Sequence, residues 1–371
     1  MQVTFLTWRD TGHPDGGGSE EYVEHVAAGL ARRGHDVTVV CASYPGTAED
    51  ETRDGVRFRR RGGRLTVYLH GLAYVTVGRG RHSDAVVEVV NGIPFGAGTA
   101  RRRVTVPLVH HLHREQWRMI YPGWRGRLGW WIERTTIRRY RHLRFLTVSD
   151  ATAADLADLG VPAASVHVVP NGAEPRPRRE PAADGGPVLC TLSRLVPHKQ
   201  LEHAVDAVVG LSDRHPGLRL RVIGSGWWES ALREYVEQQG ASELVELCGR
   251  LSADERDDVL ASSVAMLLPS VREGWGLAVI EAALQGTPTV AYRSAGGVTE
   301  SIRDGVTGLL VDTPDELERA AGMLVDQPAL RATLSGACRP WALSFDWTQA
   351  ADEVERLLLG RGNGDQVAGV P

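Results

Sequence analysis

The protein has 371 residues, of which 42% are hydrophobic and 24% are charged, and its formal net charge is −4 at pH 7. A chain of this length exceeds the usual size of one hydrophobic core, so we expect two domains, and the composition is that of a soluble globular protein. The weakly negative charge excludes a general affinity for nucleic acid.

The amino-terminal segment MQVTFLTWRD is a short apolar run followed directly by Arg9 and Asp10. It lacks the basic start and the long apolar stretch of a signal peptide, so it predicts a first β-strand. No stretch reaches the roughly 18 uncharged apolar residues that a membrane span needs. We therefore expect a cytoplasmic protein, with peripheral contact to the inner face of the membrane left open.

Four cysteines are spread through the chain: Cys41, Cys190, Cys248 and Cys338. Their spacing suits neither a zinc site nor a dithiol redox centre. We expect them to be buried and reduced, as cysteines of cytosolic proteins usually are.

Short apolar runs alternate with longer amphipathic stretches, which is the pattern of βα units on a parallel sheet. A first series of predicted strands, with a helix at 19–33, runs through residues 3–8, 36–42, 85–90, 104–110, 145–149 and 166–170. A second series opens with its own first strand and runs through residues 187–193, 218–224, 244–249, 265–270, 288–292 and 308–312. The sequence therefore predicts two α/β domains.

The segment AEPRPRREPAADGG lies between the two series. Its prolines and paired glycines predict a linker, 173–186, that neither packs nor forms a helix. The linker separates an amino-terminal domain, 1–172, from a carboxyl-terminal domain, 187–340. A helix-like stretch follows at 347–360, and we expect the tail, 361–371, to be disordered.

Residues 101–144 contain twelve arginines but only two acidic residues, Glu115 and Glu133. Four tryptophans are interleaved with them: Trp117, Trp124, Trp130 and Trp131. This pattern fits a basic, aromatic face for an anionic acceptor or a membrane surface. It also fits a solvated, arginine-rich helix whose tryptophans pack inward.

The stretch REGWGLAVIEAALQG places Glu273 and Glu281 on either side of a Gly-Trp-Gly turn, with seven residues between them. We expect a loop from Glu273 to Gly276 and a helix from Leu277 to Leu284. The glycines allow backbone N–H groups to approach a ligand, and Glu281 can accept both hydroxyls of a diol such as ribose. The alternative is that both glutamates are solvated surface residues.

The stretch CTLSRLVPHKQLEHAVDAV places Arg194 and Lys199 after the carboxyl end of a predicted strand, and Lys199 is the only lysine of the chain. A departing diphosphate needs its charge neutralised, and Arg and Lys can do so without a metal. A single lysine can also occupy such a position by chance. No Asp-x-Asp pair and no His or Cys cluster has ligand spacing, so we expect no metal ion.

Two loops of the amino-terminal half are also candidates for a binding site. GGGSEEYV places Gly17 and Gly18 before a helix, where backbone amides can approach a phosphate or a sugar. PLVHHLHREQW places His110, His111 and His113 at the end of a strand, where one of them can serve a polar site unless all are structural.

VIGSGWWES offers Gly224 and Gly226, which resemble part of a dinucleotide-binding loop. The third glycine is missing, Glu229 stands near its place, and no acidic residue ends a following strand. We therefore expect no nicotinamide cofactor.

Taken together, these residues resemble the family-four glycosyltransferases of group 1 type. The resemblance extends from Met1 to about Gly360 and rests on five segments in family order: Gly17 and Gly18, VVPNGAE, SRLVPHK, the Glu273 and Glu281 pair, and GGVTESIRDGVTGLLV. It implies the GT-B fold, an α/β architecture of two Rossmann-like parallel-sheet domains facing a central cleft. It also implies that a helix at about 341–360 returns to the first domain.

The resemblance implies roles for particular residues. Arg194 and Lys199 look like the basic pair that grips the donor diphosphate, and Glu281 looks like the carboxylate on the ribose. His113 falls where the family keeps a cleft histidine on the donor sugar, although His110 and His111 leave the register open by a few residues. The remaining donor contacts implied are Gly17, Gly18, Glu273, Gly274, Trp275, Gly276 and Leu277.

The catalytic residues implied are Lys199, Arg194, Glu273 and His113. The reaction implied is retaining transfer of a hexose or N-acetylhexosamine from a nucleotide diphosphate sugar, with same-face attack by the acceptor and no enzymic nucleophile. No metal or other cofactor is expected beside this co-substrate. We favour a uridine nucleotide because it is the commonest donor in the resembling family, and the acceptor stays open between a natural product and a cell-envelope glycan or lipid.

The sequence departs from the family in the loop of Arg194 and Lys199. Ser193 and Gln200 stand where glycines are usual, and His198 stands where a glutamate is usual. Because Arg194 and Lys199 are kept, the departure concerns the local shape of the loop and not its chemistry.

Three other functions are weighed against this one. A sugar nucleotide 2-epimerase of the same fold needs its own acid and base residues, and the spacing of Glu273 and Glu281 argues against it. A non-catalytic nucleotide-sugar-binding protein would be free to lose Arg194 and Lys199. An NAD-dependent oxidoreductase fits worst, and the sequence does not indicate an oligomeric state.

Overall fold

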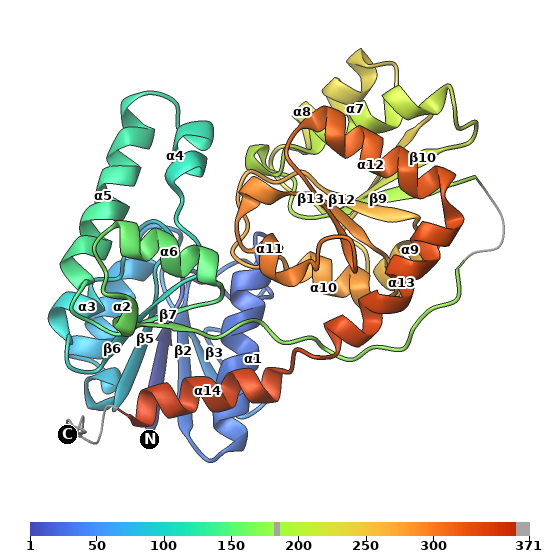
Figure 1. The fold of residues 1–371 in the computed structure, drawn as a ribbon. Coiled ribbons are helices and arrows are strands. Elements are labelled where there is room, and N and C mark those ends of the chain that lie inside the picture. Colours follow the sequence, from blue (N-terminus) through green and yellow to red (C-terminus); the bar gives the residue numbers. More distant parts are fainter. Residues whose placement is uncertain (182–185, 361–371) are drawn as a thin grey trace, which may run out of the picture. The chain divides into compact units, whose positions relative to one another are not determined.

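The computed structural model describes residues 1–181 and 186–360. They form two compact units, drawn in Figure 1. Among the described residues, unit 1 contains Met1–Arg114, Gly123–Gly172 and 346–360, and unit 2 contains Glu115–Pro122 and Ala173–Phe345. Each unit is built on its own sheet, which confirms the predicted two-domain α/β fold.

The sheet of unit 1 has eight strands in the order β3-β4-β2-β1-β5-β6-β7-β8, and every pair is parallel except β3 with β4. The six strands predicted here are present. The strands are β1 Gln2–Leu6, β2 Asp36–Cys41, β3 Asp50–Arg53, β4 Val56–Arg60, β5 Ala85–Val89, β6 Thr105–Val109, β7 Phe145–Thr147 and β8 Val166–Val168.

The antiparallel hairpin of β3 and β4 was not predicted. It lies at the edge of the sheet and carries charged residues at its exposed positions, so it lacks a continuous apolar run. Asp54 and Gly55 form its turn, and their φ angles are 52° and 77°. An Asp-Gly pair with positive φ is the usual two-residue hairpin turn, and this was the signal in the sequence.

Helices of unit 1 include α14, which packs against α1. The rings of His25 and Trp347 stack with 4.4 Å between their centroids. A Cβ atom on Gly29 would lie 2.4 Å from Cβ of Ala351, so the two helices approach closely because Gly29 has no side chain. The helices are α1 Gly18–Arg32, α2 Val67–Thr76, α3 Ala97–Ala100, α5 Trp124–Tyr140, α6 Asp150–Asp158 and α14 Trp347–Leu359, with 3₁₀ turns η1 Arg79–His82 and η2 Ala163–Ser165.

Within residues 101–144, strand β6 is followed by two helices, α4 (Arg114–Ile120) and α5. Trp130 packs against a core cluster of unit 1, but Trp124 is 63% exposed and Trp131 is 60% exposed. The alternative in which the tryptophans pack inward is therefore wrong for these two residues.

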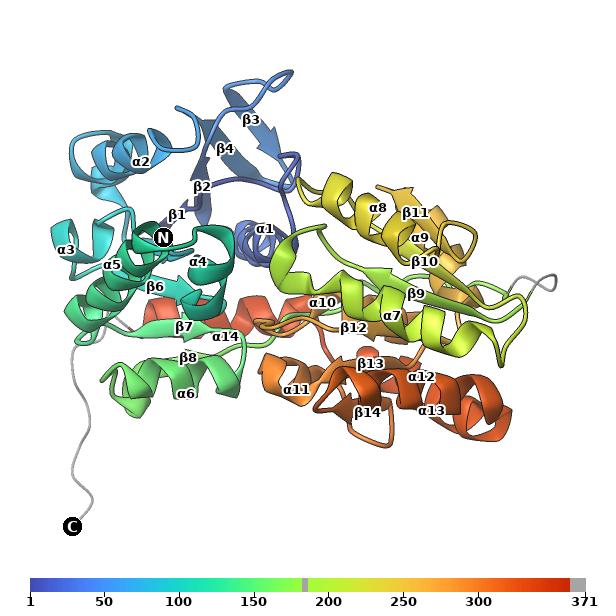
Figure 2. The same cartoon turned by 90° about the horizontal axis from the view of Figure 1, so that it is seen from above.

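The sheet of unit 2 is wholly parallel, with the order β11-β10-β9-β12-β13-β14 that Figure 2 shows from above. Along the chain, β10 and β11 are added on one side of β9, and β12, β13 and β14 are then added on the other side. Ligands of such doubly wound sheets bind at the carboxyl ends of the strands where the order reverses, here between β9 and β12. The strands are β9 Val188–Leu192, β10 Arg219–Ile223, β11 Val245–Gly249, β12 Ala265–Leu268, β13 Thr289–Tyr292 and β14 Gly308–Val311.

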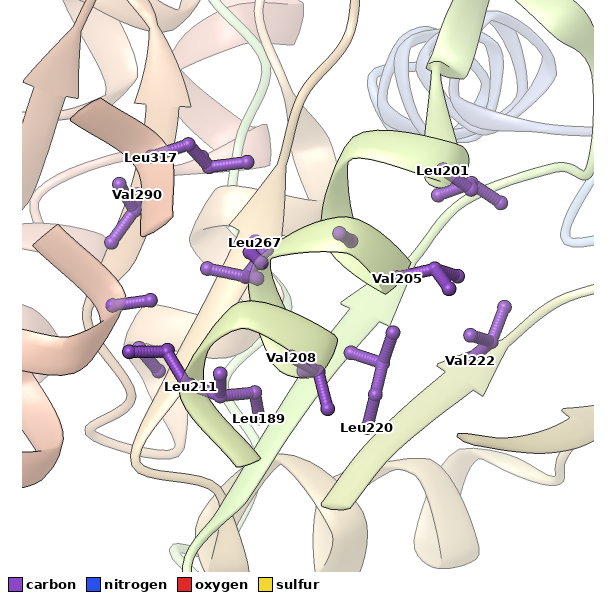
Figure 3. Packing of buried hydrophobic residues seen from close by; sticks show 14 of the residues in the cluster. Leu189, Leu201, Val205, Val208, Leu211, Leu220, Val222, Leu267, Val290 and Leu317 are labelled. Atoms are coloured by element: carbon purple, nitrogen blue, oxygen red, sulfur yellow. The ribbon is translucent and has the colours of Figure 1, made fainter. Parts of the chain in front are cut away.

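Helices cover both faces of the unit 2 sheet. Leu189, Leu220 and Leu267 pack with α7, α8 and α12 in the cluster of Figure 3. Cys190 and Met266, the neighbours of Leu189 and Leu267 in the chain, pack on the other face with α9, α10 and α11, as strand alternation requires. The helices are α7 Leu201–Ser212, α8 Glu229–Gln238, α9 Ala253–Ser262, α10 Leu277–Leu284, α11 Val298–Ser301, α12 Pro314–Asp326 and α13 Pro328–Ala342, with 3₁₀ turns η3 Pro197–Lys199 and η4 Arg293–Ala295.

The prediction that 173–186 does not pack is wrong for its described part. Arg176 pairs with the buried Asp257 (Nε to Oδ2, 2.5 Å) and with Asp254 (Nη2 to Oδ1, 2.8 Å). Arg179 also pairs with Asp254, at 2.5 Å. The arginines between the prolines thus fix the segment to the acidic face of α9. Residues 182–185 and the tail, 361–371, lie outside the described residues.

All four cysteines are free, as predicted, and Cys41, Cys190 and Cys338 are buried. The prediction of burial is wrong for Cys248, which is only half-buried. Cys248 lies on β11, and because β11 is an edge strand, its side chains have fewer neighbours than those of the central strands.

Candidate functional site

The loop after β9 leaves the unit 2 sheet where the strand order reverses, and it carries Arg194 and Lys199. Backbone hydrogen bonds attach it to both neighbouring loops. Leu195 N–H donates to Ser225 O at 3.0 Å, and Val271 N–H donates to His198 O at 2.9 Å. The loop is therefore fixed to the ends of β10 and β12 on either side of it.

Lys199 forms an ion pair with Glu273 across these loops. Its Nζ lies 2.5 Å from Oε1 of Glu273, and each side chain is 13% exposed. The N–H of Glu273 donates to Ala295 O at 2.8 Å, which fixes the loop that carries the carboxylate. Charges shielded from water are costly unless they are paired, so this pairing holds a cationic group at the sheet edge. Such a group can neutralise a phosphate oxygen.

The Gly-Trp-Gly turn needs Gly276 for its backbone shape. Gly276 has φ of 95° and precedes α10, and a Cβ atom there would lie 3.2 Å from a methyl group of Val279. The Trp275 side chain is buried, with its ring edge-on to Phe345 at 4.8 Å. The ring therefore anchors the turn from within unit 2, and the backbone of the turn is what can face a ligand.

Glu281 lies in the second turn of α10, as predicted, and pairs with Arg256 of α9. Oε1 of Glu281 lies 2.5 Å from Nη1 of Arg256, and the two side chains are 23% and 21% exposed. This contact orients a carboxylate that is still reached by solvent. A carboxylate held in this way can accept hydrogen bonds from two neighbouring hydroxyls.

Gly224 and Gly226 allow the loop after β10 to touch the loop of Arg194. A Cβ atom on Gly224, whose φ is 134°, would lie 1.8 Å from Ser193 O. One on Gly226 would lie 2.2 Å from Leu195 O. The two glycines thus allow the backbones of the two loops to pack closely. This packing explains why glycine stands at both positions, without a dinucleotide-binding role.

Gln200 ends η3 with φ of 47° and ψ of 43°, in the left-handed region. Side chains seldom adopt this conformation and glycine does so readily. The loop therefore keeps a backbone shape that suits glycine, although glutamine stands there.

Gly17 and Gly18 precede α1 in unit 1, as predicted. The Gly17 N–H already donates to Oε2 of Glu20 at 2.8 Å, and Glu20 also pairs with the buried Arg9 (Oε1 to Nε, 3.1 Å). The amide of Gly17 is thus occupied by the chain itself. The prediction that this loop contacts the donor therefore depends mainly on Gly18.

His113 is held by Glu133 within unit 1. Its Nδ1 lies 2.9 Å from Oε1 of Glu133, and its backbone N–H donates to Oε2 at 3.2 Å. The Glu133 side chain is fully buried and that of His113 is 21% exposed. Because a carboxylate accepts, this contact places a proton on Nδ1, so that Nε2 is the acceptor whenever the ring is neutral.

The other two histidines differ from His113. His110 is buried with its ring edge-on to Tyr22 at 5.4 Å, and burial lowers the pKa of His110 to about 4. The ring of His111 contacts that of His113 at 4.4 Å. His110 thus belongs to the interior of unit 1, and His113 is the one whose ring is oriented by a carboxylate.

Two partners of the candidate residues were not predicted, Glu133 and Arg256. Glu133 is the only acidic residue of α5 and lies among arginines, which was a signal that it serves a specific partner. Arg256 lies on α9, far from Glu281 in the sequence, and no local pattern could have paired them.

The predicted site residues divide between the two units. Unit 1 holds Gly17, Gly18 and His113, and unit 2 holds Arg194, Lys199, the Glu273 to Leu277 turn and Glu281. Across residues 1–181 and 186–360, no group of three or more His, Cys, Asp or Glu side chains is arranged to hold a metal ion. No helix in the same described ranges has both the length and the apolar character that crossing a membrane requires.

Comparison with known proteins finds two family models in succession along the chain. "Glycosyl transferase 4-like domain" matches residues 17–172, and "Glycosyl transferases group 1" matches residues 174–339. A curated relative from Mycolicibacterium smegmatis, named GDP-mannose-dependent alpha-(1-6)-phosphatidylinositol monomannoside mannosyltransferase, is 29% identical over 387 residues. The alignment covers 94% of this chain and 96% of the relative.

Solved structures share the fold. Sucrose-phosphate synthase from Thermosynechococcus elongatus has a TM-score of 0.81 at 20% identity, over 97% of this chain and 99% of that one. Anabaena HepE in complex with UDP and glucose has a TM-score of 0.74 at 18% identity, over 97% and 99%. Three observations indicate the same family. They are the two adjoining family models, the relative aligned along almost the whole chain, and the two parallel-sheet units. The chain belongs to the group 1 glycosyltransferases of GT-B fold.

Proposed function

We propose that this glycosyltransferase moves a hexose or an N-acetylhexosamine from a nucleoside diphosphate sugar to an acceptor hydroxyl in the cytoplasm, with retention of configuration and without a metal ion. The observation that carries the proposal is the ion pair of Lys199 and Glu273 at the ends of β9 and β12, with Arg194 on the same loop as Lys199. Cations of the chain itself are thus available where a doubly wound sheet binds phosphate.

In the proposed reaction the bond between the anomeric carbon and the diphosphate oxygen breaks as the acceptor oxygen attacks the same face of the sugar. Arg194 and Lys199 neutralise the charge that develops on the diphosphate, and the acceptor proton passes to a departing phosphate oxygen. Glu281 binds the ribose hydroxyls. Glu273 and the backbone of the Gly-Trp-Gly turn bind hydroxyls of the transferred sugar, and His113 contributes from unit 1.

The nucleotide base is proposed as uracil or guanine. The Mycolicibacterium relative is GDP-mannose-dependent by name, and the Anabaena protein was solved with UDP and glucose. The name of that relative, a phosphatidylinositol monomannoside mannosyltransferase, supports a cell-envelope glycan or lipid as the acceptor, and a natural product remains the alternative.

The first experiment measures nucleotide release from UDP, GDP, ADP and dTDP sugars with EDTA present. We expect one donor to be hydrolysed in EDTA, and Lys199→Ala to lower the rate by about 10²-fold or more, as loss of one charge-stabilising group does. Arg233→Ala, an exposed arginine of α8, is the matched control and should keep the wild-type rate. The anomeric configuration of the product, read by NMR, tests retention.

Other outcomes point to the other functions weighed above. Conversion of the donor sugar to its 2-epimer without an acceptor would indicate an epimerase. Tight nucleotide binding without turnover, with or without candidate glycolipid acceptors, would indicate a binding protein. Loss of activity in EDTA, restored by a divalent cation, would contradict metal independence.

A further inference from the structure

Helix α5 presents an apolar stripe to solvent. Trp124, Leu128 and Trp131 are 63%, 43% and 60% exposed. Their spacing of four and then three residues places them on one face of the helix. Single exposed apolar residues are ordinary on a protein surface, but an aligned set with two tryptophans marks an interaction site. We refer to these three residues as the α5 stripe.

The stripe is not the face by which α5 packs on its own domain. Ile137 and Tyr140 are buried in a core cluster of unit 1, and Glu133 is buried beside His113. These residues hold the opposite side of the helix. The α5 stripe is therefore apolar surface beyond what the core of unit 1 uses.

Three arginines flank the stripe. Arg127, Arg134 and Arg138 are exposed, and helical spacing places them along one edge of it. Within residues 1–181 and 186–360, no carboxylate forms an ion pair with any of the three, because the one acidic residue of α5, Glu133, faces inward. The face thus joins exposed apolar side chains to a row of positive charge.

We propose that the α5 stripe and its three arginines dock the protein on an anionic lipid membrane. A helix with one apolar face and a basic border lies in the plane of the membrane interface, its apolar side chains in the acyl boundary. Tryptophan favours this depth, and arginine is attracted by anionic headgroups. The inference goes beyond the proposed function, since it identifies a partner surface and not a reaction.

Other partners fit this face less well. A second copy whose α5 packs antiparallel across a twofold axis would place the arginine rows against each other, which is repulsive. A nucleic acid would satisfy the arginines but would leave the Leu128 side chain without an apolar environment, and the net charge of the chain is negative.

The test is co-sedimentation of the full chain with vesicles of phosphatidylcholine, with and without phosphatidylglycerol. We expect binding to the anionic vesicles and its weakening as salt rises. Replacing the three arginines by glutamine should lower the partition coefficient by about 100-fold, at roughly fivefold for each arginine. W124A together with W131A should lower it by about tenfold or more.

The chain offers matched controls in unit 2. Trp227 is 58% exposed, and Trp227→Ala should leave vesicle binding unchanged, as should Arg319→Gln on α12. Donor hydrolysis should be equal in all these variants. A docking defect is thereby separated from a failure of the proposed reaction.

Three results would overturn the inference. The first is the absence of binding to anionic vesicles, or equal binding to neutral ones. The second is binding that neither the arginine nor the tryptophan variant weakens. The third is self-association without vesicles, seen as a concentration-dependent mass, that both variants abolish.

Discussion

Arg256 is the residue that orients Glu281, the proposed ribose ligand. The two side chains meet at 2.5 Å, and each is only about one-fifth exposed. We predict that Arg256→Gln weakens binding of the nucleoside diphosphate by about three- to tenfold, because the carboxylate loses an orienting partner. Calorimetric titration with UDP and GDP measures the change.

The control for this prediction is Arg221→Gln. Arg221 pairs with Glu246 at 2.8 Å on the exposed side of β10, away from the residues proposed to bind nucleotide. It should leave the affinity unchanged. An equal loss of affinity in both variants would mean that Arg256 acts through general stability and not through Glu281.

His110 makes unit 1 sensitive to acid. Burial lowers the pKa of His110 to about 4, with the charge of Glu20 raising it and that of His113 lowering it further. Between pH 6.5 and 4 the unfolded chain binds a proton that the folded state excludes, so stability falls as the pH falls. From pH 7 to pH 5 this costs about 2 kcal/mol.

His110→Phe removes this proton uptake and keeps a ring against Tyr22. We predict that its melting temperature falls less than that of the wild type between pH 7 and pH 5, by roughly 4 to 8 °C for a domain of this size. His82→Gln, at an exposed position, should retain the wild-type response. An unchanged pH response in His110→Phe would show that other groups carry it.

At the residue scale, the sequence indicated candidate site residues but not which of them are in contact. Arg194, Lys199, Glu273 and Glu281 were identified from local strand, loop and helix patterns. The contact between Lys199 and Glu273 depends on β9 and β12 lying side by side, which is a property of the strand order. Arg256 could not be predicted because its only signal is spatial.

At the scale of elements, the loop after β10 packs directly against the loop that carries Arg194. A Cβ atom on residue 224 would lie 1.8 Å from the carbonyl oxygen of Ser193, which is far too close for two atoms that are not bonded. We predict that Gly224→Ala displaces this loop, costs about 2 kcal/mol or more in stability and lowers nucleotide affinity at least tenfold. Thermal unfolding and titration with UDP and GDP test both effects.

Gly240→Ala is the control that distinguishes the effect of a strained backbone conformation from the effect of a steric clash. Gly240 also has a positive φ, of 65°, but no atom lies within 4 Å of the place of its Cβ. It should lose only about 1 kcal/mol and keep its nucleotide affinity. If Gly224→Ala loses no more stability and no more nucleotide affinity than Gly240→Ala, the close contact with the loop of Arg194 does not explain the glycine at position 224.

The predictable elements were those with strong periodicity. Central strands such as β1 and β9 are buried on both faces and appear as apolar runs, whereas the edge hairpin of β3 and β4 alternates with charge and was missed. The linker was predicted from its prolines and paired glycines. Its arginines pair with acidic residues of α9 that are distant in the sequence, so its packing could not be predicted from the local sequence.

At the scale of the whole molecule, unit 1 is completed by the last described helix of the chain. Helix α14 buries Trp347, Val354 and Leu358, and it rests on α1 where Gly29 meets Ala351. Arg33, which follows α1, also forms an ion pair with Glu355 of α14 at 3.4 Å, and Nε2 of His35 lies within hydrogen-bonding distance of the same carboxylate, at 2.6 Å. Unit 1 thus depends on a segment that follows unit 2 in the sequence, and each unit has its own core.

We therefore predict that Gly29→Leu destabilises unit 1 and leaves unit 2 intact. The added side chain separates α1 from α14 and should cost about 3 kcal/mol, which lowers the unit 1 transition by roughly 6 to 12 °C in differential scanning calorimetry. UDP or GDP, which we propose binds to unit 2, should still raise the second transition. Gly336→Leu, on α13 with open space around it, should shift neither transition downward. A single transition that moves as a whole in Gly29→Leu would mean that the two units unfold together, and that α14 stabilises the entire molecule and not unit 1 alone.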